Sequence, residues 1–177
     1  MERFGSVLAV LGGDGAPGDV SGLAVEIARA DRAALTFVDV IRDEMSLLSD
    51  TEIAARREGL AQAVAAADFA GIAASEALLH GDPAVEVIRM VLREGHDLVL
   101  VGEGSGPETV AQLLAECPSP VWRIGSPRPE RVIAVLPDGH GPDAAQVRAL
   151  AQSVARGLGG DVAMRAAGGA AGAVPEG

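Results

Sequence analysis

Short apolar runs alternate with longer segments of helical period along most of this chain, and this alternation limits the folds that it can adopt. Runs of strand length cover residues 7–11, 35–41, 73–79, 98–101 and 121–124, and two further runs cover 132–136 and 162–164. Between the runs, apolar residues recur every three or four positions, as on the buried face of a helix. Strands that alternate with helices predict β-α-β units and a parallel sheet.

The helical segments carry apolar stripes and start signals that agree with this arrangement. The stripes are Val20, Leu23, Ala24, Ile27 and Ala28; then Val85, Ile88, Val91 and Leu92; then Val110, Leu113, Leu114 and Cys117. Ser49 and Glu52 have the spacing of a capping box and predict a helix over residues 51–68. Asp82 and Pro83 suit an N-cap and the first helical position. Because Cys117 continues a stripe, we interpret it as a packing residue and not as a reactive thiol.

Charge and composition exclude several classes of function. The formal net charge is −11 and all 14 basic residues are arginine, so the chain has neither the clustered cations that neutralise nucleic-acid phosphates nor the lysine of phosphate-loop or Schiff-base chemistry. No stretch is long and apolar enough to span a membrane, and the N-terminus has no secretory segment. A single cysteine, Cys117, excludes an intramolecular disulfide. We therefore expect a cytoplasmic protein that binds neither nucleic acid nor membrane.

The opening of the chain is partly repeated near its C-terminus. The run at residues 7–11 and the Asp-Gly pair after it are echoed about 125 residues later by the run at 132–136 and a second Asp-Gly pair. We predict a complete domain over residues 1–126, a partial second β-α-β repeat over 127–166, and a flexible Gly- and Ala-rich tail over 167–177. One β-α-β unit buries too little surface to fold alone, so we expect the repeat to pack on the first domain or a second chain, or to belong to a longer parent.

Several stretches closely resemble the universal stress protein family. The run Gly81-Asp82-Pro83-Ala84 is similar to that family's helix start, and residues 94–102 are similar to its fourth strand with the glycine that ends it. Pro120-Val121 is similar to the start of its fifth strand. The resemblance covers residues 5–125 and, as a half copy, 131–166. It implies a doubly wound α/β fold of the flavodoxin or Rossmann type, an open parallel sheet of order 3-2-1-4-5 with helices on both faces.

That strand order fixes where a ligand would bind. Open α/β sheets bind ligands beyond the strand C-termini where the order reverses, here between strands 1 and 4, so the relevant loops are residues 12–18 and 102–109. The resemblance implies an adenosine contact near the end of strand 1, where residue 11 or 12 stands and an aspartate is displaced to position 14, and an adenine contact from the backbone near Val40. The candidate binding residues are Gly12, Gly13, Asp14, Val40, Gly102, Gly104, Ser105, Gly106 and Thr109.

The loop after strand 4 departs from the ATP-binding members of the family. Those members carry Gly-x2-Gly-x9-Gly-Ser/Thr, in which glycines let backbone N–H groups approach phosphate oxygens. Their Gly-Ser pair stands 13 and 14 residues after the first glycine, whereas Glu108 and Thr109 stand 6 and 7 residues after Gly102. Seven residues of loop are missing, and each carboxylate of Glu103 and Glu108 would cost about 1–4 kcal/mol at about 4 Å from a phosphate. We expect ATP to bind poorly.

The first loop carries a competing pattern. Glycines at positions 13, 15 and 18 follow a strand and precede a helix, and Asp39 stands 21 residues further on, as in a dinucleotide-binding fingerprint. Asp14 and Asp19, however, stand where a pyrophosphate would lie, and Pro17 has no N–H to donate. The alternative of a dinucleotide-dependent enzyme stays open beside the simpler interpretation of a flexible loop.

The remaining reactive groups form no motif that indicates catalysis or metal binding. His80, His96 and His140 lack metal-ligand spacing, and no Ser-His-Asp set, Cys-His pair or carboxylate pair stands in a recognisable context. We interpret the charged stretch 50–58 as the solvated face of a helix with local ion pairs.

The function that we predict is a non-catalytic regulatory or stress-response module with a degenerate nucleotide pocket. It would hold no metal and no resident cofactor. ATP and AMP stay as alternative ligands. The main alternative is an adenine-nucleotide sensor that binds ATP or AMP. The resemblance also implies a homodimer, or a pseudo-dimer within the chain, that forms through the fifth strand, while the sequence does not identify a protein partner.

Overall fold

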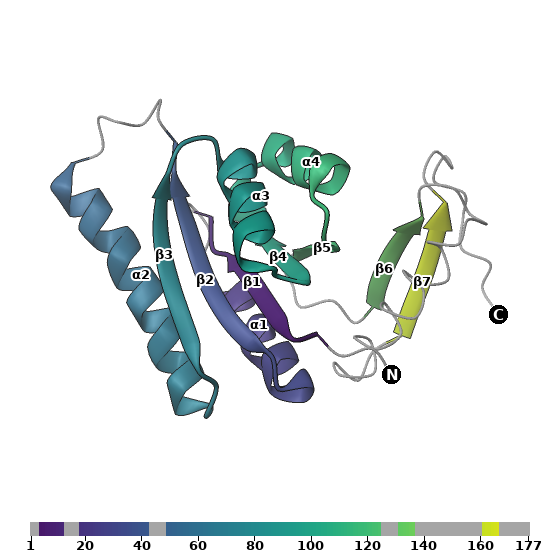
Figure 1. The fold of residues 1–177 in the computed structure, drawn as a ribbon, viewed down its shortest axis with the longest axis horizontal. Coiled ribbons are helices and arrows are strands. Elements are labelled where there is room, and N and C mark those ends of the chain that lie inside the picture. The colour runs from purple at the N-terminus through teal and green to yellow at the C-terminus, as the bar shows by residue number, and fades with distance from the viewer. Residues whose placement is uncertain (1–3, 13–17, 43–48, 125–130, 137–160, 167–177) are drawn as a thin grey trace. The chain divides into compact units, whose positions relative to one another are not determined.

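The first unit of the chain is a parallel sheet covered by helices. The computed structural model describes residues 4–12, 18–42, 49–124, 131–136 and 161–166. The strands are β1 (Ser6–Val10), β2 (Ala34–Ile41), β3 (Ala74–His80), β4 (Leu98–Gly102) and β5 (Val121–Ile124), in the order β3-β2-β1-β4-β5 (Figure 1). The helices are α1 (Gly18–Asp31), α2 (Asp50–Phe69), α3 (Pro83–Glu94) and α4 (Pro107–Glu116). The doubly wound sheet and its strand order are confirmed.

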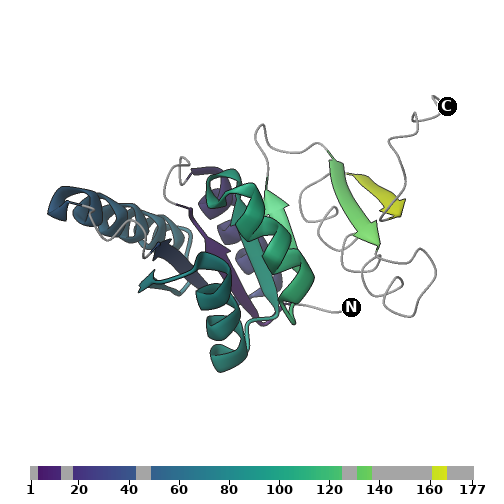
Figure 2. The ribbon, with the colours of Figure 1, turned by 90° about the horizontal axis from the view of Figure 1, so that it is seen from above.

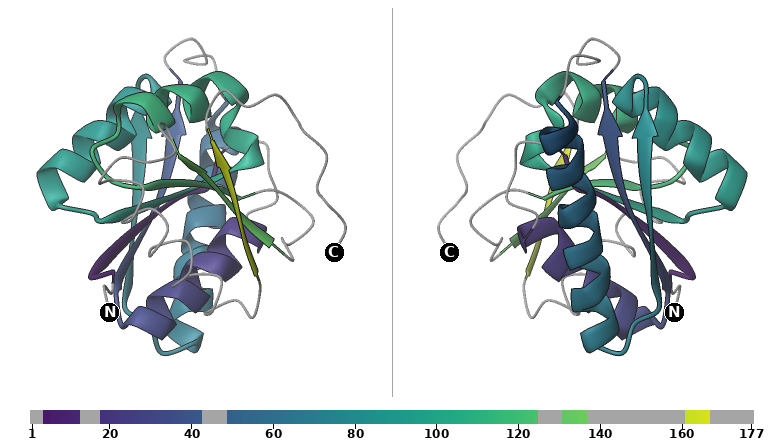
Figure 3. Two further views of the ribbon diagram at one scale, coloured as in Figure 1. Left: turned by 90° about the vertical axis from the view of Figure 1, so that its right-hand side faces the viewer. Right: turned by 90° about the vertical axis from the view of Figure 1, so that its left-hand side faces the viewer.

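The helices lie on both faces of this sheet. Helices α1 and α2 cover one face and α3 and α4 cover the other, as the view from above shows (Figure 2), and the side views show the strands between these two layers (Figure 3). The chain adds strands first on one side of β1 and then on the other. Because each crossover is right-handed, the helices of the two halves lie on opposite faces of the sheet. The reversal therefore falls between β1 and β4.

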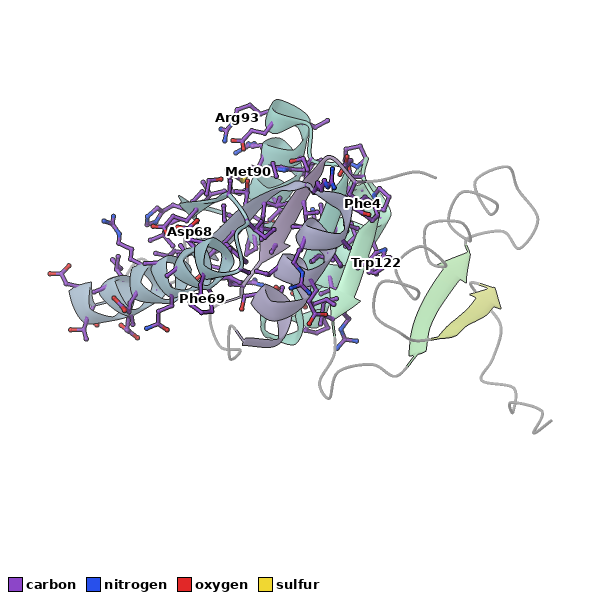
Figure 4. The ribbon with its side chains drawn as sticks, turned by 90° about the horizontal axis from the view of Figure 1, so that it is seen from below. Phe4, Asp68, Phe69, Met90, Arg93 and Trp122 are labelled. Carbon is purple, nitrogen blue, oxygen red and sulfur yellow. The ribbon has the colours of Figure 1, made fainter. Side chains whose placement is uncertain are left out.

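The central strands are apolar along their whole length because both of their faces are covered. Residues Val7, Leu8 and Ala9 of β1 and all four residues 98–101 of β4 are completely buried. The outer strands differ: β3 exposes Ser75 and Glu76, and β5 exposes Arg123. On β5, Trp122 is half-buried at the edge of the sheet (Figure 4). Dimerisation through this strand stays a prediction.

The helix stripes predicted from the sequence are correct for α1 and partly wrong for α3. All five apolar residues of the α1 stripe are buried. On α3 the buried residues are Pro83, Ala84, Val87, Met90 and Val91, while Leu92 is 69% exposed. The neighbouring stripe packs against the sheet. It has the same 3.6-residue period and includes the small Ala84, two residues after the N-cap Asp82. On α4, Leu114 is likewise exposed and Cys117 is half-buried, and burial raises the pKa of the Cys117 thiol.

The helix starts follow the sequence signals. The Ser49 hydroxyl accepts from the Glu52 N–H at 3.4 Å, and the Glu52 carboxylate accepts from the Ser49 N–H at 2.8 Å, so the capping box is complete. The bonds that the Glu52 carboxylate accepts from the Ser49 N–H and from the Ser49 hydroxyl lower the pKa of Glu52. Asp82 caps α3 by accepting from the Val85 N–H at 3.0 Å, and Pro83 occupies the first helical position. Both predicted starts are confirmed.

A second compact unit contains two further strands. Strands β6 (Arg131–Leu136) and β7 (Asp161–Ala166) pair in parallel, with Arg131 opposite Asp161 and Leu136 opposite Ala166. A parallel pair needs a crossover between its strands. The helix expected there and the expected flexible tail lie in residues 137–160 and 167–177, outside the described residues. The partial repeat and the predicted domain boundaries therefore remain predictions.

A polar cluster joins the starts of β1, β4 and β5 at the opposite edge of the sheet from their C-termini. His96 is 4% exposed, and its Nδ1 lies 2.8 Å from the Ser6 hydroxyl oxygen. The Asp97 carboxylate accepts from the N–H groups of Gly5 at 2.7 Å and Ser6 at 3.1 Å, and the Ser119 hydroxyl donates to the His96 carbonyl at 2.7 Å. Burial lowers the pKa of His96, although the carboxylates of Glu94 and Asp97 act in the opposite direction.

This cluster predicts a loss of stability at mildly acidic pH. Because the pKa of folded His96 lies below its ordinary value near 6.5, the unfolded chain takes up a proton first, and stability falls as pH decreases below that value. We expect the free energy of unfolding, measured by urea denaturation, to fall between about pH 7 and pH 5 and His96→Asn to flatten this slope. His80→Asn, at an exposed position at the end of β3, is the control. An unchanged slope in the His96 variant would contradict the assignment.

Candidate functional site

A cleft of about 180 Å³ lies beyond the C-terminal ends of β1, β2 and β4. Its lining residues are Val10, Gly12, Asp39, Val40, Arg42, Arg56, Pro83, Gly104, Ser105 and Gly106. Because β1 and β4 are the neighbours between which the strand order reverses, the cleft lies at the switch point, the usual ligand position in open α/β sheets. The volume is below the roughly 300–1,000 Å³ of sites for drug-sized ligands.

The floor of the cleft is a contact between two backbones. Gly12 has a φ of +59°, and a Cβ on it would lie 2.7 Å from the Ser105 nitrogen and 2.8 Å from the Gly104 carbonyl carbon. Only glycine combines this conformation with this approach. A Cβ on Gly102 would lie 2.7 Å from the Val20 side chain, so Gly102 allows α1 to pack on the end of β4. The loops after β1 and β4 therefore touch directly.

The segment between β4 and α4 is short and contains a buried hydroxyl that has no hydrogen-bond partner among the described residues. It consists of a single 3₁₀ turn, Glu103–Ser105, followed by Gly106, which is the N-cap of α4 and makes no side-chain capping bond. Ser105 is 8% exposed, and its hydroxyl has no hydrogen-bond partner in the described part of the chain. The first turn of α4 also contains the buried Thr109, whose hydroxyl accepts from Arg42 Nη2 at 2.8 Å.

A buried ion pair forms one wall. The Asp39 carboxylate accepts from Arg56 Nη1 at 3.0 and 2.9 Å and from the Val40 N–H at 2.8 Å, and the two side chains are 7% and 14% exposed. The sequence interpretation of residues 50–58 as a solvated face is therefore wrong for Arg56, which lies against β2. The signal that could have identified the pair is an acid near the end of a strand followed by arginine in the first turns of the next helix.

Some of the binding residues predicted from the sequence line the cleft, and others do not. Gly12, Val40, Gly104, Ser105 and Gly106 line the cleft. Gly102 packs against α1, Thr109 contacts the cleft through Arg42, and Gly13 and Asp14 lie outside the described residues. The lining residues that the binding prediction missed are Val10, Asp39, Arg42, Arg56 and Pro83.

The carboxylates expected beside a phosphate are not part of the described lining. Glu108 is exposed and does not line the cleft, and the side chain of Glu103 is not described. The charged residues of the lining are instead Asp39, Arg42 and Arg56. The acid expected to hold a dinucleotide ribose, Asp39, is engaged by Arg56.

Comparison with known proteins agrees with the fold and the strand order. The model of the universal stress protein family matches residues 4–124. The chain belongs to this family. No curated protein matches it. In the described residues, no helix is long and apolar enough to cross a membrane, and no group of three or more His, Cys, Asp or Glu side chains could hold a metal ion.

Solved universal stress proteins share the fold of the first unit. The protein from Archaeoglobus fulgidus in complex with dAMP has a TM-score of 0.58 at 17% identity and covers 69% of this chain and 98% of its own. UspA from Lactobacillus plantarum has a TM-score of 0.61 at 20% identity, with 70% and 99% covered. A universal stress protein in complex with cAMP has a TM-score of 0.57 at 18% identity, with 70% and 98% covered.

The backbone contact at the floor predicts a strict requirement for glycine at position 12. We expect Gly12→Ala to lower the free energy of unfolding by about 1–3 kcal/mol, because alanine at positive φ is strained and its methyl group would overlap the Ser105 backbone. Gly22→Ala on α1 is the control: nothing lies within 4 Å of its added methyl group, and we expect it to be neutral or to stabilise by up to about 1 kcal/mol. Urea denaturation measures both, and equal stabilities would contradict the contact.

The buried ion pair predicts strong coupling between its members. Asp39→Asn or Arg56→Gln should each lower the free energy of unfolding by about 3 kcal/mol, because each leaves a desolvated charge without its partner. The double variant should lose clearly less than the sum of the two, as a double-mutant cycle would measure. Arg93→Gln, at an exposed pair with a side chain that is 67% exposed, should cost less than about 1 kcal/mol. Additive losses at Asp39 and Arg56 would show that they do not act as a pair.

Proposed function

We propose that this universal stress protein is a non-catalytic stress-response module whose crevice does not accommodate a nucleoside triphosphate. The observation that carries the proposal is the length of the connection after β4. β4 ends at Gly102 and α4 begins at Pro107. The two ends of this short connection are fixed, one by α1 against Gly102 and the other by Gly12 against Ser105.

A triphosphate needs hydrogen-bond donors from many successive residues, and the connection between β4 and α4 supplies few. Loops that wrap a chain of phosphates offer successive backbone N–H groups around each one. Here Gly12 lies against the backbone of Gly104 and Ser105, and Pro107 at the start of α4 has no N–H. Compact ligands are therefore favoured over extended ones.

The chemistry of the lining supports a binding role without catalysis. A hydroxyl nucleophile needs a general base within hydrogen-bond reach. The Ser105 hydroxyl has no such partner among the described residues, and the Asp39 carboxylate is held by Arg56 and the Val40 N–H. That engagement of Asp39 also counts against the dinucleotide-dependent alternative, in which this carboxylate would bind a ribose.

A second candidate function, sensing of an adenine mononucleotide, is supported by the charge of the cleft. Two arginines and one aspartate line it, which leaves one positive charge in excess among the described lining residues. The family members solved with dAMP and with cAMP each hold a nucleotide that carries one phosphate. Val40, beside which the resemblance places the adenine contact, lines the same cleft.

Calorimetric titration separates these possibilities. We expect ATP, with or without magnesium, to bind at least about tenfold more weakly than AMP, because the short connection cannot hold the outer phosphates. We also expect purified protein incubated with ATP to release no phosphate or ADP. Stoichiometric, tight binding of ATP would contradict the main proposal, whereas failure of AMP and cAMP to bind would remove only the sensor candidate.

A further inference from the structure

The guanidinium of Arg42 lies against the N-terminal end of α4. Its Nη2 donates to the Thr109 hydroxyl over 2.8 Å and lies 3.7 Å from the place that a Cβ on Gly106 would take. Gly106 is the N-cap of this helix of ten residues, and no side chain caps it. The N–H groups of a helix's first turn have no partner within the helix and carry a positive partial charge. Two positive groups therefore converge at one point of the cleft.

Among the described residues that line the cleft, no carboxylate neutralises the positive charge of Arg42 and of the end of α4, because Asp39 pairs with Arg56. The charge of Arg56 is compensated by Asp39, whereas the contact found for Arg42 is with the neutral hydroxyl of Thr109. Glu108, in the first turn of α4, is exposed and does not line the cleft. Helix N-termini favour anions, so an anion between Arg42 and the end of α4 would be attracted by both groups.

A second observation at the same point is independent of charge. The Ser105 hydroxyl is buried and has no hydrogen-bond partner among the described residues, and Ser105 lines the cleft one position before the N-cap. Buried hydroxyls in native proteins nearly always have a partner, so a buried hydroxyl at the wall of a cleft indicates a ligand or water that completes it. A hydroxyl can donate to an oxyanion.

We propose that Arg42 determines the ligand specificity of this crevice by binding a single compact oxyanion of the phosphate monoester class. The anion would accept from the guanidinium, from the Ser105 hydroxyl and from first-turn N–H groups of α4. This inference rests on the cleft of the proposed function and names the group by which a mononucleotide would be held. A guanidinium has five N–H donors in a planar fork, so the bond to Thr109 leaves donors for a phosphate.

The proposal explains how a crevice with a short loop can still bind an anion. Backbone donors spread over a long loop can bind several phosphates, whereas one guanidinium binds one phosphate, often with two parallel hydrogen bonds. Thr109 orients Arg42 from the helix that also supplies the N–H groups. The arrangement therefore favours a terminal single phosphate over a chain of phosphates.

The test compares Arg42→Gln with the wild type, using inorganic phosphate, adenosine and AMP as separate probes. We expect calorimetry to show that phosphate and AMP bind the wild type competitively and that Arg42→Gln weakens both by about tenfold or more, because a hydrogen bond to a charged group is lost. Adenosine affinity should be unchanged. Arg57→Gln is the matched control, since Arg57 lies on α2 next to Arg56 and is exposed.

Two further variants keep the test decisive. Ser105→Ala removes the hydroxyl without adding volume and should weaken phosphate binding by a smaller factor, about threefold. Arg42→Lys keeps the charge but not the planar fork, so it should bind phosphate more weakly than the wild type and more tightly than Arg42→Gln. Thermal unfolding of each variant without ligand shows whether the fold is retained.

The outcomes distinguish this inference from the sensor candidate. Binding of phosphate that depends on Arg42, without any binding of AMP, supports the oxyanion site and removes the adenine nucleotide. Binding of AMP that Arg42→Gln leaves unchanged supports the sensor and overturns the role of Arg42. Absence of phosphate binding to the wild type, or equal weakening by Arg57→Gln, also overturns it.

Discussion

The architecture of the crevice depends on the contact between the backbone of Gly12 and the peptide that joins Gly104 to Ser105. Because a Cβ at position 12 would lie 2.7 Å from the Ser105 nitrogen, the loops after β1 and β4 can meet only with a glycine there. The meeting fixes where the chain enters α4, and so fixes the position of the uncapped Gly106 and of the first-turn Thr109. It also holds the Ser105 hydroxyl against Gly12 without a described hydrogen-bond partner, in a residue that lines the cleft. The uncapped start of α4 and the unpartnered Ser105 hydroxyl, both used in the functional argument, follow from this approach of two loops.

The second determinant is local charge, which acts against the charge of the whole chain. A net charge of −11 repels anions at long range, but solvent and salt screen charges that lie more than about 8–10 Å away. Among the described residues that line the cleft, the charged ones are Arg42, Arg56 and Asp39. The pair of Arg56 with Asp39 holds α2 against β2 and contributes no net charge, so the electrostatic character of the cleft depends on Arg42 and on the end of α4. An acidic protein can thus contain a site that favours an anion.

Sequence alone predicted the fold well because the signals for it are local or periodic. Strand-length apolar runs, the capping box at Ser49 and the Asp82-Pro83 start do not depend on distant contacts, and each agrees with the structure. The stripe on α3 was misplaced because two neighbouring stripes share one period, and only packing against the sheet decides that Leu92 is exposed. In the site, the switch-point rule located the glycine loops. The arginines were missed because an acid near a strand end and an arginine in the next helix are common in such folds, and only the packing of α2 against β2 brings Arg56 to Asp39.

The exchange of a long backbone loop for an arginine changes what such a crevice can distinguish. A glycine loop binds a chain of phosphates through many weak dipoles whose positions follow the shape of that chain, so it distinguishes ligands by their number of phosphates. A guanidinium beside a helix end concentrates the attraction at one point, and it distinguishes ligands by whether a doubly charged terminal phosphate reaches that point. The attraction is then more electrostatic and more sensitive to salt where it is exposed to solvent. Shortening the connection between β4 and α4 therefore alters the kind of recognition as well as its strength.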